Sequence, residues 1–329
     1  MAKMRKMRKM RKSIVSQWLS TTNWGDWKRI TMTGDASERR YERLINQNGK
    51  SVILMDAPPE TCGSQSRFVD IAVHLKSLNL LAPEVLERDD KKGLLILSDL
   101  GQHNFAQHLR ATPKDETKLY SAAVNVLRSL QSTPPPSGLA VMTPDIGARM
   151  ISIAFEWAAT DRSADLITEI TARLRGLLHE VDPNPRVLSL RDFHAENLIW
   201  RATDHDNSRV GLLDFQDAFI THSTYDLASL LRDARRDVDP ELLNPLLTQL
   251  AGEGGNLGDF KRAFHVMAVQ RNLRILGIFH RLARRDGKTK YLSLIPRVWA
   301  HLQADLATPD LIDLGHLIAR AFDPERTYS

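Results

Sequence analysis

The sequence is short of cysteine and of long apolar runs. Cys62 is the one cysteine among 329 residues, and no run approaches the ~18 apolar residues that a membrane-spanning helix requires. A lone cysteine cannot form an internal disulfide, and it leaves no group of thiolates for a structural zinc site. A disulfide-stapled secreted domain and a membrane protein are therefore excluded, and we expect a reducing, cytoplasmic location.

Excess positive charge is missing from most of the chain, although the formal net charge is +5. Seven of the 45 Lys and Arg residues lie within residues 1–12, and the other 38 face 40 Asp and Glu residues. We therefore expect residues 1–13 to be a disordered basic tail, and nucleic acid to be an unlikely partner of the remainder. The alternative is that this tail binds nucleic acid or another acidic surface.

The residues after the tail divide into a strand-rich part, 14–100, and a helical part, 101–329. In the first part, two short strands flank the turn 46–49, a helix is expected over 68–78, and two more strands flank the turn 88–93. A short β-like segment, 187–214, interrupts the second part. Helical periodicity covers residues 119–130, 146–158, 166–178, 225–235, 260–282 and 292–306. This order predicts an α+β protein with a small β-rich lobe and a larger helical lobe.

Three polar residues in the β-like segment form the minimum set for transferring a phosphoryl group. Asp192 is followed five residues later by Asn197, and Asp214 ends the next expected strand. The first aspartate can accept the proton of an attacking hydroxyl, while the amide and second carboxylate suit Mg²⁺ on the phosphates. The alternative is ordinary turn chemistry, in which Asp192 caps a turn and Asp214 ends a buried strand.

Several segments together resemble the aminoglycoside phosphotransferase and choline kinase-like family of the protein-kinase fold. More narrowly, they are similar to the bacterial N-acetylmuramate/N-acetylglucosamine anomeric kinases, which act in cell-wall recycling. The segments are Gly34–Tyr41, Met55–Pro59, Ser98–Gly101, Leu190–Asn197, Asp214–Ala218, Tyr225–Leu227 and Gln270–Leu273. The resemblance implies a bilobed protein-kinase-like fold, ATP and Mg²⁺ as cofactors, and a small-molecule sugar as substrate.

The resemblance also implies a role for individual residues. Asp192 is the expected catalytic base, Asn197 and Asp214 are the expected metal ligands, and Asp226 supports the catalytic loop. The expected nucleotide-binding residues are Gly34, Ala36 and Ser37 at the phosphates, and Ser98, Asp99 and Leu100 at the adenine.

Two residues depart from the family pattern. Leu190 stands where the family usually has a histidine, which supports the catalytic loop without entering the chemistry, and the second departure is Met55. The lysine that grips the phosphates from the third strand should fall near Met55, whose thioether cannot bind phosphate. Arg40, beside the expected phosphate loop, is the nearest replacement and counts among the expected nucleotide-binding residues; Arg39 is the second candidate. Both could instead be solvated charges on an edge strand.

The acceptor is the least determined part of the function. Glu156, Trp157, Arg271 and Arg274 are candidate sugar contacts. An aminoglycoside is an alternative acceptor, but residues 261–290 hold nine cations and one anion, which favours a neutral or carboxylate-bearing molecule. A catalytically inactive binding module is the other alternative, and it is favoured only by Met55. The oligomeric state stays open.

Overall fold

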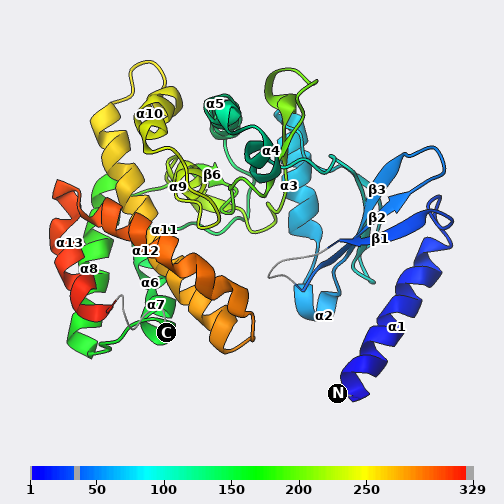
Figure 1. Cartoon of the computed structure of the whole chain (residues 1–329), viewed down its shortest axis with the longest axis horizontal. Coiled ribbons are helices and arrows are strands. Elements are labelled where there is room, and N and C mark those ends of the chain that lie inside the picture. Colours follow the sequence, from blue (N-terminus) through cyan, green and yellow to red (C-terminus); the bar gives the residue numbers. More distant parts are fainter. Residues whose placement is uncertain (1, 33–37, 324–329) are drawn as a thin grey trace. The chain divides into compact units, whose positions relative to one another are not determined.

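The computed structural model describes residues 2–32 and 38–323. It divides the chain into two compact units (Figure 1). The first unit comprises Met1–Gln102 and Gly211–Gln216, and the second comprises His103–Val210 and Asp217–Ser329. The sequence assigned 211–216 to the helical part, but the Leu212 N–H donates a hydrogen bond to the Leu81 carbonyl and so ties this segment to the first unit. Within the described residues, no helix has the length and hydropathy of a membrane span.

A five-stranded antiparallel sheet forms the centre of the first unit (Figure 1). The strand order is β1-β2-β3-β5-β4. The four strands expected from the sequence are present, and a further strand, β1, pairs with β2 along the edge. The strands are β1 (Lys28–Met32), β2 (Arg40–Ile45), β3 (Ser51–Asp56), β4 (Val85–Asp89) and β5 (Leu94–Ser98).

Three helices complete the first unit, and one of them corrects a prediction. They are α1 (Ala2–Leu19), α2 (Pro59–Cys62) and α3 (Ser66–Ser77). The expectation of a disordered tail over residues 1–13 is wrong from Ala2 onward, because Met, Lys and Arg are strong helix formers and the end of α1 is anchored. Val15, Trp18 and Leu19 are buried against the sheet residues Leu44, Val52, Leu54, Leu94 and Ile96.

The two faces of the sheet can be told apart by strand alternation. Side chains two residues apart share a face, and directly paired residues on adjacent strands share it too. Leu44, Val52 and Leu54 pack on α1, so they define what we call the α1 face. The side chains between them, including Ile53 and Met55, belong to the opposite face.

The second unit is mostly helical, as expected. Its helices are α4 (Phe105–Ala111), α5 (Glu116–Gln131), α6 (Pro144–Arg149), α7 (Ser152–Trp157), α8 (Ala164–Val181), α9 (Tyr225–Leu231), α10 (Leu243–Ala251), α11 (Leu257–Arg284), α12 (Ile295–Leu306) and α13 (Ile312–Ala321). Short 3₁₀ turns are η1 (Pro113–Asp115), η2 (Asp206–Arg209), η3 (Pro240–Leu242), η4 (Thr289–Leu294) and η5 (Pro309–Leu311).

Short strands interrupt these helices, and one expected helix is divided. β6 (Val187–Ser189) pairs antiparallel with β9 (Phe219–Thr221), and β7 (Leu198–Trp200) lies between them in the chain. The chain passes to the first unit within β8 (Val210–Leu212). The helix expected over 146–158 is split into α6 and α7. The start of α7 lies against α11 at Gly277, where even a Cβ atom would fall 2.4 Å from the backbone of Ile153.

Candidate active site

A tightly bonded loop between β6 and β7 carries the expected base. Asp226, at the start of α9, is buried and accepts hydrogen bonds from the Ser189 hydroxyl at 2.7 Å, the Leu190 N–H at 2.7 Å and the Arg191 N–H at 3.0 Å. Arg191 has φ 73°, a conformation that costs a non-glycine residue energy. Asp226 therefore holds a strained turn in place directly before Asp192.

The electrostatic environment of Asp226 is unusual for a carboxylate. Burial raises its pKa to about 6, although the hydrogen bonds from Ser189, Leu190 and Arg191 lower it. The nearby charge of Asp192 raises it further. The loop is therefore held by an acceptor that is mainly ionised at neutral pH and becomes protonated near pH 6.

Asn197 is oriented by the loop that it closes. Its side-chain Nδ2 donates to the Asp192 carbonyl at 2.9 Å and lies 3.3 Å from Nε2 of His194. The Asn197 N–H also donates to the His194 carbonyl. Because the amide nitrogen is engaged on this side, the Oδ1 atom, which is the atom that a hard cation requires, points elsewhere.

In the first unit, Asp214 lies on a second strained turn. Its φ is 58°, its side chain is exposed, and its Oδ1 accepts a hydrogen bond from Gln216 Nε2 at 2.7 Å. The next residue, Phe215, is buried and stacks on Phe68 of α3 with ring centroids 4.9 Å apart. This stacking fixes the backbone, while the other carboxylate oxygen can serve as a metal ligand.

Tyr41 is a candidate that the sequence analysis missed. It pairs directly with Met55, so both side chains belong to the face opposite α1. Burial raises the pKa of the Tyr41 phenol, and the negative charge of Asp214 raises it further, while Arg39 lowers it. This coupling associates Tyr41 with Asp214 and Arg39. The sequence could have revealed it only through the register of β2 on β3.

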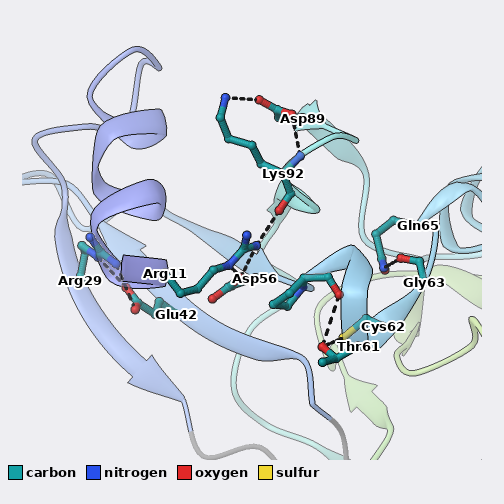
Figure 2. A network of polar contacts seen from close by, with 11 residues as sticks. Arg11, Arg29, Glu42, Asp56, Thr61, Cys62, Gly63, Gln65, Asp89 and Lys92 are labelled. Carbon is teal, nitrogen blue, oxygen red and sulfur yellow. Dashed lines mark hydrogen bonds and ion pairs between the residues drawn. The ribbon is translucent and has the colours of Figure 1, made fainter. Parts of the chain in front are cut away.

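The structure does not favour Arg40 as the phosphate-binding cation. Arg40 pairs with Asp56, on the α1 face. Figure 2 shows the partners on this side: Arg11 of α1 donates to the Asp56 carboxylate at 2.7 Å and to the Lys92 carbonyl at 2.6 Å. Alternation therefore directs Arg40 away from Tyr41 and Met55, which corrects the role that proximity in sequence suggested for it.

The segment expected to meet adenine is held by hydrogen bonds of the Ser98 and Asp99 side chains. Ser98 makes two hydrogen bonds with the backbone of Glu84. Its N–H donates to the Glu84 carbonyl, and its hydroxyl accepts from the Glu84 N–H. Asp99 accepts from Arg43 at 2.5 Å and from Ser51 at 2.7 Å. Burial opposes ionisation of Asp99, but these bonds outweigh it and hold its pKa below the ordinary value. The side chains of Ser98 and Asp99 are therefore engaged in hydrogen bonds within the first unit.

The remaining expected site residues fall into two groups. Gly34, Ala36 and Ser37 lie outside the described residues. The candidate sugar contacts lie in the second unit: Glu156 is exposed and Trp157 half-buried on α7, while Arg271 is buried and Arg274 half-buried on α11. Arg271 is 4% exposed and its Nη1 has no hydrogen-bond partner among the described residues.

Arg271 also has electrostatic links to the catalytic loop. Burial raises the pKa of Tyr225 to about 12. The positive charge of Arg271 lowers this pKa, and the negative charge of Asp192 raises it. Of the four candidates, Arg271 is therefore the one whose charge acts on the same buried group as the charge of Asp192.

Comparisons with known proteins show which sequences this chain is similar to. Residues 28–263 match the family described as "Phosphotransferase enzyme family". An N-acetylmuramate/N-acetylglucosamine kinase of Caulobacter vibrioides is 33% identical, over 90% of this chain and 92% of that protein.

Two solved structures share the fold. A choline/ethanolamine kinase family protein from Mesorhizobium loti has a TM-score of 0.66 at 14% identity, over 94% of this chain and 99% of the other. The amicoumacin kinase hAmiN, in complex with AMP-PNP, Ca²⁺ and Ami, also has a TM-score of 0.66 at 14% identity, over 95% of this chain and 99% of the other.

Proposed function

The chain belongs to the phosphotransferase enzyme family, and from this premise we propose that it is an ATP-dependent kinase for the anomeric hydroxyl of N-acetylmuramate and N-acetylglucosamine. It is a phosphotransferase that acts on a hydroxyl group. The observation that carries the choice of acceptor is the 33% identity, over nine-tenths of the chain, to a kinase named for these two sugars. The reaction that we propose would serve cell-wall recycling.

In the proposed reaction, Asp192 is the base. Its carboxylate accepts the proton of the sugar C1 hydroxyl as the hydroxyl oxygen bonds to the γ-phosphorus of ATP. The bond between that phosphorus and the bridging oxygen breaks, and ADP leaves with the bond's electron pair. Asp226 keeps Asp192 in place through the turn at Arg191. Replacement of any part of this support should therefore affect catalysis more than nucleotide affinity.

Asn197 and Asp214 would hold Mg²⁺ in this proposal. Both offer a neutral or anionic oxygen, the ligand type that Mg²⁺ prefers, and hydrogen bonds from or to neighbouring groups orient each side chain. The cation would neutralise charge on the phosphates. Support for a divalent cation also comes from the Ca²⁺ in the complex of the amicoumacin kinase.

The remaining contacts are proposed by analogy with the family. Backbone groups of Gly34, Ala36 and Ser37 would bind the phosphates, and the backbone at Leu100 would meet adenine. Arg271 is the best-supported sugar contact, since a buried cation with an unpaired nitrogen suits the carboxylate of N-acetylmuramate. The single cysteine and the need for ATP support a cytoplasmic site of action.

An acceptor screen tests the proposal. Purified protein with Mg-ATP should release ADP with N-acetylglucosamine and with N-acetylmuramate, and only at background rate with an aminoglycoside such as kanamycin. The reason is that Arg271, a buried cation whose Nη1 has no hydrogen-bond partner among the described residues, repels a polycation and attracts a carboxylate. Turnover with kanamycin alone would favour the antibiotic-modifying alternative. If the folded protein binds no nucleotide and releases no ADP with any of these acceptors, the inactive binding module is favoured.

A further inference from the structure

A phosphate-binding cation has to replace the strand lysine if the proposed function is right, and the inference below rests on that function. Met55 lies on β3 with 0% exposure and has no charge to offer. Transfer of a phosphoryl group from ATP requires cationic groups on the phosphates in addition to the metal. The replacement should lie in the first unit, on the face of the sheet that bears Met55.

The register of β2 on β3 separates the cations of β2 into two groups. Tyr41 pairs with Met55, and Arg43 pairs with Ile53, so odd-numbered residues of β2 belong to the face opposite α1. Even-numbered residues belong to the α1 face, because Leu44 packs on α1 and Arg40 pairs with Asp56.

Contacts of individual side chains agree with this division. On the α1 face, Glu42 accepts hydrogen bonds from Arg29, which also donates to Ser16 of α1 (Figure 2 shows the pair of Arg29 and Glu42). On the opposite face, Arg43 donates to Asp99 and to the Gly101 carbonyl. Arg43 is therefore on the right face, but it is committed to the segment after β5.

Arg39 immediately precedes β2 and has the parity of Tyr41. It is half-buried, whereas Arg40 is exposed. We propose that Arg39 binds the phosphates of the nucleotide in place of the strand lysine, and that Arg40 has no part in nucleotide binding. Tyr41, between Arg39 and Met55 in this arrangement, positions the guanidinium. The electrostatic coupling of Tyr41 to both Arg39 and Asp214 supports the placement, because Asp214 is the proposed metal ligand of the same unit.

Matched substitutions of neighbouring arginines test this inference. We expect Arg39→Met to weaken the binding of Mg-ADP and to raise KM for ATP by about 10- to 100-fold, the value of one or two charge-assisted hydrogen bonds. The affinity for adenosine, which has no phosphate, should not change. Arg40→Met is the control, with both constants within about twofold of the wild type, because its side chain is exposed on the other face. Thermal melting establishes that both variants are folded.

A second substitution separates the loss of a phosphate contact from a general loss of structure. Met55→Lys in the Arg39→Met background should recover at least about tenfold in Mg-ADP affinity, since it places an ammonium on the proposed phosphate-binding face. Equal effects of Arg39→Met and Arg40→Met, or a loss at Arg40→Met alone, would overturn the proposal. An equal loss of adenosine and Mg-ADP binding in Arg39→Met would overturn it too. If the Arg39→Met protein does not fold, Arg39→Lys and Arg39→Gln replace it in the test. Near wild-type Mg-ADP affinity in Arg39→Lys, which keeps the charge, would support the proposal. The same affinity in Arg39→Gln, which removes the charge, would contradict it.

These measurements are separate from the choice of acceptor. Binding of Mg-ADP and adenosine needs no sugar, so the result at Arg39 stands whichever hydroxyl is phosphorylated. If the wild-type protein binds neither nucleotide nor nucleoside, the proposed kinase function itself fails.

Discussion

Replacing Asp192 with asparagine should lower kcat by about 10²- to 10⁴-fold, the usual contribution of general base catalysis, with little change in the affinity for Mg-ATP. Asparagine keeps the size of the side chain but cannot accept a proton at neutral pH. The bonds around it, in which its N–H donates to the Leu190 carbonyl and its carbonyl accepts from Asn197, involve backbone groups that the substitution leaves in place. The loss should therefore appear in turnover and not in nucleotide binding.

The measurement is steady-state kinetics with sugar and ATP each varied, together with equilibrium binding of Mg-ATP. Asp217→Asn is a matched control, because Asp217 is an exposed aspartate that follows Asp214 closely in the sequence and has no proposed part in the reaction. Undiminished kcat in Asp192→Asn would show that another group accepts the proton. A loss of the same size in Asp217→Asn would mean that the effect is not specific to the base.

Replacing Asp214 with alanine should lower kcat/KM for ATP by about 100-fold or more, since metal ions supply several kcal/mol of charge stabilisation in phosphoryl transfer. The Mg²⁺ concentration that gives half the maximal rate should rise at the same time. The physical cause is removal of a carboxylate that Gln216 orients from a strained backbone position.

A titration of the rate with Mg²⁺ at saturating ATP checks this expectation, and Asp217→Ala provides the control. Alanine at position 214 would have to adopt the same positive φ of 58° without the hydrogen bond that Asp214 accepts from Gln216. Asp214→Asn, which keeps an oxygen acceptor, should therefore be measured alongside. An unchanged Mg²⁺ dependence in both Asp214 variants would remove this residue from the metal site.

Local sequence features were sufficient to predict much of this molecule. The hairpin around Asn46–Gly49, helix α3 and the strands β4 and β5 follow from periodicity and turn residues, because these elements are stabilised by neighbours in sequence. The loop that carries Asp192 and Asn197 was found through spacing and through resemblance to a family.

Contacts between distant residues account for what could not be predicted. Contacts with distant residues stabilise helix α1. Arg11 donates to Asp56, 45 residues away, and Trp18 packs against residues of the sheet. The direction of Arg40 depends on the parity of β2 relative to β3, and a shift of one residue in such a pairing exchanges the two faces. No periodicity within residues 39–41 distinguishes the two arginines.

The central claim, that the protein is an anomeric amino-sugar kinase, is tested most directly by identifying its product with phosphorus NMR and mass spectrometry. Asp192 needs only a hydroxyl in line with the γ-phosphate, so the position attacked must be measured. We expect N-acetylglucosamine and ATP to yield the sugar 1-phosphate, and the 1-O-methyl glycoside, which lacks the nucleophile, to give no product. A 6-phosphate, or phosphorylation of the methyl glycoside at a comparable rate, would contradict the central claim.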